Sequence, residues 1–259
     1  MQPWAIVDRA RAPRGAELQL ARRGDEWVVR IGGRVLMSSR VHGSEEALAA
    51  LALRRLERRR TILIGGLGLG FTLRAALDRL PPEARVVVAE LSPEVAAWNR
   101  GPVAHLAGRP LDDPRVRLQI GDVAGRIAEA KKAFDAILLD VDNGPSPAAR
   151  TGNPSLYGAR GIRACLEALR PGGVLAVWSA GPDERYRERL ERAGLRARAE
   201  EVPVRVGGGA RHVVFLGVKA GPGPVPARRE EPRASAPRGA PRPRRPTRWS
   251  ARRSAGRSG

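Results

Sequence analysis

Apolar positions between residues 60 and 180 come in short continuous runs, and helical patterns separate most of them. Runs this short, bounded by turn residues, favour strands over buried helices. Runs that do not alternate with polar residues are typical of parallel strands buried on both faces of a sheet. We therefore predict an α/β fold of the Rossmann-like type. Its expected strands lie at 61–64, 85–90, 116–120, 136–140 and 174–178, with the clearest helices at 74–80, 93–100 and 158–169.

The first 59 residues follow a different pattern, with short alternating runs and then a helix. Gly32-Gly33 separates two such runs, which predicts a small N-terminal β-hairpin region. Ser44 precedes two acidic residues and an apolar helical face, as at the start of a helix. We therefore divide the chain into an N-terminal region at 1–59 and a Rossmann-like domain at 60–220. The domain is expected to end with a helix at 183–193 and an antiparallel strand pair at 196–206 and 212–218.

Residues 221–259 consist mostly of Pro, Arg, Ala, Ser and Gly. Such a segment buries too little apolar surface to offset its chain entropy, so we predict a disordered tail. It contains eleven arginines and two glutamates, a charge of +9 out of +20 for the chain. A basic surface attracts phosphate-rich partners, which would give the tail a weak association with nucleic acid. The alternative is an arginine-biased composition whose side chains are simply solvated.

The rest of the composition argues against three classes of protein: disulfide-rich, membrane-spanning and metal-binding. One cysteine, Cys165, excludes an intramolecular disulfide framework and fits a reduced, cytoplasmic setting. No apolar run approaches the roughly 18 residues of a spanning helix, and the N-terminus does not resemble a signal peptide, so no membrane association is expected. The three histidines, His42, His105 and His212, are dispersed, and we predict no metal site.

A glycine-rich loop follows the first strand of the predicted sheet. Glycine lets a backbone turn sharply and approach a ligand closely, and the amides of the loop and of the next helix can face that ligand. The loop ends in Gly-Leu-Gly, which is not the usual dinucleotide spacing, and no Walker lysine follows it. We therefore expect a nucleoside site that includes Gly65, Gly66, Gly68 and Gly70.

Acidic residues end the next three strands. Glu90 lies 20 residues after Gly70, where nucleotide-binding folds place a carboxylate for the ribose hydroxyls. Asp122 is suited to accept a hydrogen bond from the adenine amine. A helix-capping role remains an alternative for both residues. Asp140 ends the fourth strand and Asp142 follows it. Because the carboxyl ends of parallel strands meet in one crevice, we expect all four acids to converge near the loop.

Three segments resemble the spermidine synthase family, the polyamine aminopropyltransferases. They are the stretch at 111–117 with Gly121-Asp122, the stretch at 134–140 with Gly144-Pro145, and the stretch at 169–177, which Leu156-Tyr157 precedes. The resemblance implies a small N-terminal β-domain before a class I methyltransferase-type sheet, and often a homodimer. It also implies transfer of an aminopropyl group from decarboxylated S-adenosylmethionine to a small amine. Glu90 would hold the ribose and Asp122 the adenine, while Asp140 would orient and deprotonate the amine and Asp142 would help to hold it.

This sequence also departs from the family's pattern. Gly68 stands where the family usually has an Asp, and the segment 43–47 lacks the Tyr and His of a Tyr-His-Glu signature. An acid at position 68 would repel the carboxylate of intact S-adenosylmethionine, so its loss leaves a methyltransferase on the same scaffold as an alternative. A second alternative is a non-catalytic module that binds nucleosides or nucleic acid.

Overall fold

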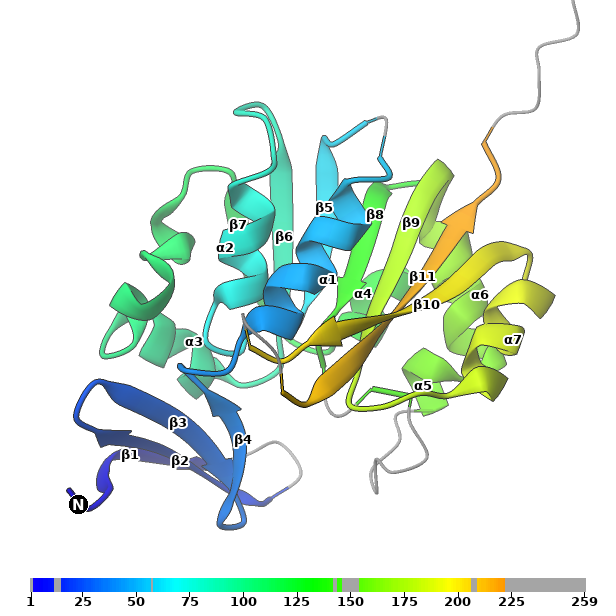
Figure 1. The fold of residues 1–259 in the computed structure, drawn as a ribbon. Helices are drawn as coiled ribbons and strands as arrows, with labels where there is room; N and C mark the ends of the chain where they lie inside the picture. Colours follow the sequence, from blue (N-terminus) through cyan, green and yellow to red (C-terminus); the bar gives the residue numbers. More distant parts are fainter. Residues whose placement is uncertain are drawn as a thin grey trace, which may run out of the picture. The chain divides into compact units, whose positions relative to one another are not determined.

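A seven-stranded sheet organises the chain between residues 61 and 219 in this computed structural model (Figure 1). The structure describes residues 2–11, 15–56, 58–141, 144–145, 154–205 and 209–221. The predicted tail lies outside these residues, except for Gly221. The strands of the sheet are β5 (Thr61–Gly65), β6 (Arg85–Glu90), β7 (Val116–Ile120), β8 (Phe134–Leu139), β9 (Leu169–Ser179), β10 (Leu195–Pro203) and β11 (Arg211–Lys219).

The strand order, β10-β11-β9-β8-β5-β6-β7, confirms the predicted Rossmann-like arrangement. Strands β5 to β9 pair in parallel, whereas β11 runs antiparallel to both β9 and β10. The chain first adds β6 and β7 on one side of β5 and then returns to add β8 and β9 on its other side, so the direction of the crossovers reverses between β5 and β8. In open α/β sheets a ligand crevice lies at this point, outside the carboxyl ends of the strands.

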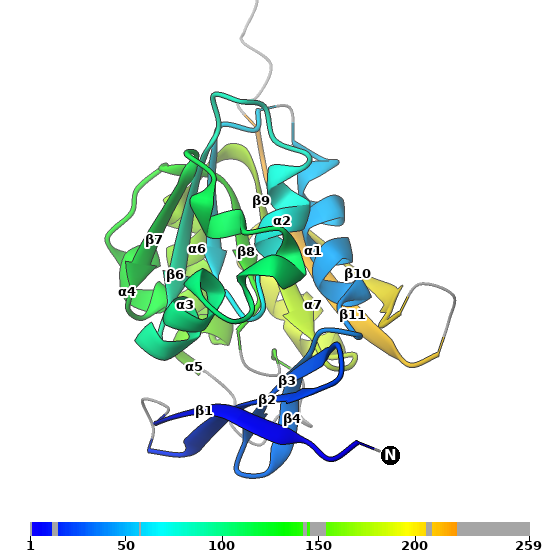
Figure 2. The same ribbon diagram turned by 90° about the vertical axis from the view of Figure 1, so that its left-hand side faces the viewer.

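Each central strand buries both of its faces. Ile62 and Ile64 of β5 join one apolar cluster, whereas Leu63 joins the other, because successive side chains of a strand point to opposite faces. Helices α1 (Gly43–Leu53), α2 (Phe71–Leu77) and α3 (Pro93–Arg100) cover the first face. Helices α4 (Val123–Ala128), α6 (Ala159–Ala168) and α7 (Glu184–Arg192) cover the second. Figure 2 shows the sheet between α1 and α2 on one side and α4 and α6 on the other.

The N-terminal region is a four-stranded antiparallel sheet rather than a single hairpin. Its strands, in order across the sheet, are β1 (Ala5–Arg11), β2 (Glu17–Arg23), β3 (Glu26–Ile31) and β4 (Arg34–Ser38). Leu18, Leu20 and Trp27 join the apolar cluster that α1 and α2 build on the larger sheet. Helix α1 itself packs against α2 and the larger sheet, so it belongs to the helical layer of that sheet.

Three short helical segments complete the described part of the chain: the 3₁₀ turns at Ala104–Ala107 and Pro110–Asp112, and α5 (Pro154–Tyr157). Cys165 of α6 is buried and belongs to the apolar cluster on the second face of the sheet. Among the described residues, none of the helices has the length and apolar character needed to cross a bilayer.

Asp135, the second residue of β8, connects three parts of the sheet. Its Oδ2 accepts hydrogen bonds from the backbone N–H groups of Arg60 (3.1 Å) and Thr61 (2.9 Å). Its Oδ1 lies 3.1 Å from Nη1 of Arg170, at the start of β9. The side chain is only 5% exposed. One buried carboxylate therefore holds the amino ends of β5 and β9 against β8.

We expect Asp135→Ala to lower the free energy of unfolding by about 1–3 kcal/mol, because it leaves two partly buried backbone donors without their acceptor. Urea unfolding of the variant and the wild type measures this difference. Asp25→Ala is the matched control, since the Asp25 side chain is fully exposed and should change stability little. Equal effects of the two substitutions would contradict the role given to Asp135.

Candidate functional site

The glycine loop lies close to the carboxyl ends of β6 and β8. Gly66 has a φ of +86°, and its N–H donates to the Ala89 carbonyl at 2.9 Å. A Cβ atom at position 66 would lie 2.2 Å from the Asp140 carbonyl oxygen, so only glycine fits there. Gly68 and Gly70 also have positive φ values, and Gly65 is buried at the end of β5. The four glycines thus form the tight turn that the sequence predicted.

Glu90 is buried at the end of β6 and accepts hydrogen bonds from the loop. Its Oε2 accepts from the Leu67 N–H and its Oε1 from the Ser92 N–H, both at 2.8 Å. Burial raises the pKa of the Glu90 carboxyl, although these backbone donors oppose the rise. The helix-capping role that was an alternative for Glu90 belongs instead to Ser92, whose hydroxyl accepts from the Val95 N–H at the start of α3.

Asp122 ends the neighbouring strand but is exposed. Its Oδ1 accepts from the Ala124 N–H at 2.9 Å and caps α4, as the capping alternative predicted. The adjacent Gly121 N–H donates to the Glu90 carbonyl at 2.9 Å, so the ends of β6 and β7 are held together. The second carboxylate oxygen of Asp122 has no hydrogen bond to a described residue, so capping does not exclude contact with a ligand. Contact with adenine stays a prediction.

Asp140 shares its surroundings with Glu45, an acid that the sequence pattern places only at the start of a helix. Thr72 of α2 donates its hydroxyl to Oδ2 of Asp140 at 2.6 Å. The same hydroxyl lies 3.4 Å from the backbone carbonyl of Glu45. The first turn of α1, the start of α2 and the end of β8 therefore meet at one place.

Burial raises the pKa of both carboxyls. It raises the pKa of Glu45 to about 7, with the nearby Asp140 charge contributing further. It also raises the pKa of Asp140 to about 6, with the Glu90 charge adding to this and the Thr72 hydrogen bond opposing it. Neither acid forms an ion pair with a residue that the structure describes. Two acids without a cation are expected to bind a positive charge readily.

Ser44 connects Glu45 to two aromatic side chains, His212 and Trp178. The buried Ser44 hydroxyl donates to Oε2 of Glu45 at 2.6 Å and lies 3.0 Å from Nδ1 of His212. The Trp178 ring meets the His212 ring edge to face, with their centroids 4.6 Å apart. Burial lowers the pKa of His212, which favours the neutral imidazole. Ser44 and His212 are far apart in the sequence, and the packing of α1 against the paired strands β9 and β11 brings them together.

The N-terminal sheet reaches the glycine loop through β4. A Cβ at position 68 would lie 3.4 Å from Sδ of Met37, so this part of the loop faces that strand. The Gly68 carbonyl accepts from Nδ2 of Asn99 at 2.8 Å. Nε1 of Trp98 donates to Oδ2 of Asp8 in β1 at 2.7 Å. The loop is thus bounded by α3 on one side and by the N-terminal sheet on another.

Asp142, the fourth predicted acid, lies outside the described residues. The other predicted residues do gather at the carboxyl edge of the sheet, and Glu45, Ser44, Trp178 and His212 join them there. Among the described residues, no group of three or more acidic, histidine or cysteine side chains could hold a metal ion.

Comparison with known proteins agrees with this geometry. The sequence model of the family described as "Spermine/spermidine synthase domain" matches residues 41–186. The polyamine aminopropyltransferase of Nitrosomonas europaea is 36% identical over 124 residues, which are 48% of this chain and 36% of that protein. The polyamine aminopropyltransferase of Mycobacterium tuberculosis strain H37Rv is 28% identical over 170 residues, which are 64% of this chain and 31% of that protein. The matched regions thus span about a third of each relative.

Solved structures show the same fold. A spermidine synthase in complex with the transition state analogue AdoDATO has a TM-score of 0.71 at 20% identity, over 83% of this chain and 74% of that one. The spermidine synthase of Thermotoga maritima has a TM-score of 0.68 at 19% identity, over 83% and 72%. The family match covers more than half of the 259 residues. The chain therefore belongs to the spermine/spermidine synthase domain family.

Proposed function

We propose that this chain transfers an aminopropyl group from a sulfonium nucleoside, decarboxylated S-adenosylmethionine, to a small amine. The observation that carries this proposal is the pair of partly buried carboxyls, Glu45 and Asp140, beside a glycine loop at the switch point of the sheet. An amine acceptor is a cation in water, and it must lose a proton before its nitrogen can attack carbon. A pair of acids without a cation is suited to both requirements.

The donor side of the site is formed by the glycine loop, Glu90 and Asp122. Each carboxylate oxygen of Glu90 accepts one backbone hydrogen bond and has a further lone pair that can accept from a ribose hydroxyl. Asp122 has an oxygen available for the adenine amine. The close approach of Gly66 to the carbonyl of Asp140 leaves no room for a side chain, so the loop backbone itself would line the nucleoside. These residues fit a nucleoside donor.

The acceptor side is formed by Asp140 and Glu45. When bound, the sulfonium donor supplies an alkyl carbon with a good leaving group. We assign to Asp140 the proton that the attacking amine gives up, because Thr72 holds its carboxylate and a pKa near 6 suits a general base. We assign to Glu45 the charge of a protonated amine, with Ser44 holding its carboxylate through a hydrogen bond. The role of Asp142 in binding the acceptor stays a proposal from the sequence.

Gly68 supports a second candidate donor. At position 68 the loop faces Met37 and carries no acid of its own, so the repulsion that an aspartate at this position would exert on the carboxylate of intact S-adenosylmethionine is absent. One assay separates the two candidates. Purified protein is incubated with each donor and a panel of diamines, and the products are identified by mass. An aminopropylated amine supports our proposal, a methylated product supports the alternative, and no product with either donor contradicts both.

We expect Asp140→Asn to lower turnover by roughly 10²–10⁴-fold, because it keeps the shape of the side chain but removes the base. Donor affinity, measured by calorimetry, should stay within a few-fold of the wild type, since Glu90 and Asp122 carry the nucleoside contacts. Full turnover in this variant would mean that another group accepts the proton.

Glu90→Gln should weaken donor binding by about 1–3 kcal/mol, because an amide offers fewer acceptor lone pairs to the ribose. Calorimetry with the donor or its thioether product measures the change. The Leu67 and Ser92 amides also depend on this carboxylate, so the melting temperature is measured in parallel. Unchanged affinity in a well-folded variant would remove Glu90 from the nucleoside site.

Glu45→Gln should change how stability depends on pH. A carboxyl whose pKa is raised by folding binds its proton more tightly in the folded state. The stabilisation from this proton is fully present below the pKa of the unfolded chain, about 4.5. It is lost as the pH rises through the pKa of the folded protein, about 7. The free energy of unfolding of the variant, relative to that of the wild type, should therefore increase by about 1–3 kcal/mol between pH 4 and pH 8. Urea unfolding across this range measures the gain.

Glu167→Gln, an exposed change on α6, is the control for removing one carboxylate and should show no such gain. A constant difference between Glu45→Gln and the wild type at every pH would show that folding does not perturb Glu45.

A further inference from the structure

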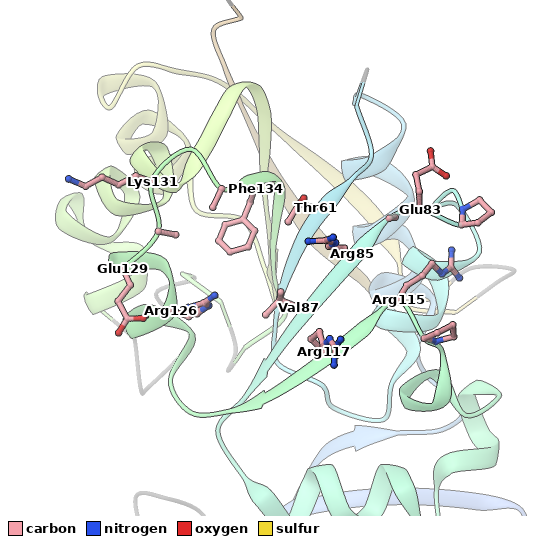
Figure 3. A pocket seen from close by; sticks show the side chains of 15 residues that line it. Thr61, Glu83, Arg85, Val87, Arg115, Arg117, Arg126, Glu129, Lys131 and Phe134 are labelled. Atoms are coloured by element: carbon pink, nitrogen blue, oxygen red, sulfur yellow. Dashed lines mark ion pairs between the residues drawn. The ribbon is translucent and has the colours of Figure 1, made fainter.

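A basic hollow lies at the edge of the sheet opposite to the candidate site. It has a volume of about 810 Å³ and is lined by the amino ends of β5, β6 and β8 and by the segment before β7 (Figure 3). Thr61, Arg85 and Phe134 are the first residues of their strands. The candidate site, in contrast, is built from residues at the carboxyl ends of these strands. The two sites are therefore separated by the length of the sheet.

Two of the arginines that face this hollow form no ion pair with a described residue, although Glu83 and Glu129 also line it. Val87 of β6 pairs with Arg117 of β7, and Arg85 lies two residues before Val87, so all three side chains share one face of the sheet. Arg85 and Arg117 are exposed, and neither forms an ion pair with a described residue. Arg115, by comparison, is held by Asp113 through a 2.7 Å contact. The hollow therefore presents free guanidinium groups beside an apolar side chain.

The positive charge continues along this edge beyond the hollow. A second hollow of about 820 Å³ is lined by Arg58, Arg59, Arg60 and Arg79, and it shares Glu83 with the first. Strand β11 also ends at this edge, because it runs antiparallel to β9, and the Ala220 carbonyl accepts from the Gly172 N–H at 3.2 Å. The sequence after Gly221 contains eleven further arginines.

We propose that this amino edge binds single-stranded nucleic acid, with Arg85 and Arg117 contacting phosphates inside the first hollow. The extent of the charge favours a polymer over a single nucleotide, because pairing with successive phosphates releases several counterions. The concave shape and the Val87 side chain favour a single strand, since unpaired bases can stack on apolar groups and on arginine planes. The same charges repel amines, so this edge is distinct from the acceptor site.

Fluorescence anisotropy with a labelled 20-nucleotide RNA and the full chain tests this proposal. We expect Arg85→Ala/Arg117→Ala to weaken binding at least 5-fold. The slope of log K against log salt should become shallower by about 1.4, which corresponds to two lost phosphate contacts on a single strand. The control, Arg34→Ala/Arg185→Ala, removes two exposed arginines from β4 and α7 that line neither hollow, and should change affinity less than 2-fold.

Further ligands separate the classes of polyanion. Single-stranded DNA of the same length should bind comparably, since phosphates and stacked bases are shared, while ATP should bind at least 100-fold more weakly than the RNA. An equal loss of RNA affinity in the two double variants would overturn the proposal, because binding would then depend only on the total charge of the protein. Tighter binding of duplex RNA or of heparin than of the single strand would overturn it as well. Circular dichroism melts confirm that both variants are folded.

Discussion

The site depends on two carboxyls, those of Glu45 and Asp140, that lie together in a partly buried place and form no ion pair with a residue that the structure describes. Burial raises the cost of ionising both groups, the Asp140 charge adds to that cost for Glu45, and the Glu90 charge adds to it for Asp140. Such an arrangement is unfavourable in isolation. It persists because three separate elements place the residues there: the start of α1, the end of β8, and Thr72 on α2, which donates to Asp140. A cationic ligand would relieve the repulsion, and so we regard this pair as an acceptor site.

Charge is distributed unevenly over the two edges of the sheet. The chain carries a net charge of +20, yet acids gather at the carboxyl edge, where the parallel strands end. Arginines gather at the amino edge, where the same strands begin. A small cation is therefore favoured at one edge and a polyanion at the other. Because the two edges are separated by the length of the strands, both can be occupied without competing for the same side chains.

The large sheet could be predicted from the sequence because each central strand is a continuous apolar run, such as Thr61–Gly65, followed by a turn or a helix. The glycine loop and Glu90 could be predicted because their spacing is set locally by one strand, loop and helix unit. Strand β1 could not be predicted, because nearly all its residues are exposed and it lacks a regular apolar alternation. Its pairing with β2 is a tertiary feature, as is the bond from Trp98 to Asp8.

The acceptor side was recognised only in part for the same reason. Asp140 follows a strong strand pattern, whereas Glu45 looked like an ordinary first-turn acid on a surface helix. Its role depends on α1 packing against α2 and the sheet, and on His212 reaching Ser44 from a strand near the end of the chain. One signal in the sequence pointed to Glu45. Segment 43–47 stands where the family has a Tyr-His-Glu signature, and the glutamate of that signature is still present.

Direct titration of the two carboxyls tests the central claim most directly. Carbon-detected NMR of ¹³C-labelled protein, with Glu45→Gln and Asp140→Asn used to assign the signals, gives the pKa of each group. We expect both carboxyls to titrate well above the ordinary values of 4.5 for Glu and 3.8 for Asp. Adding 1,4-diaminobutane should then lower at least one of these pKa values, because a bound cation favours the ionised form. Ordinary pKa values in the free protein, or no response to the diamine, would contradict the account.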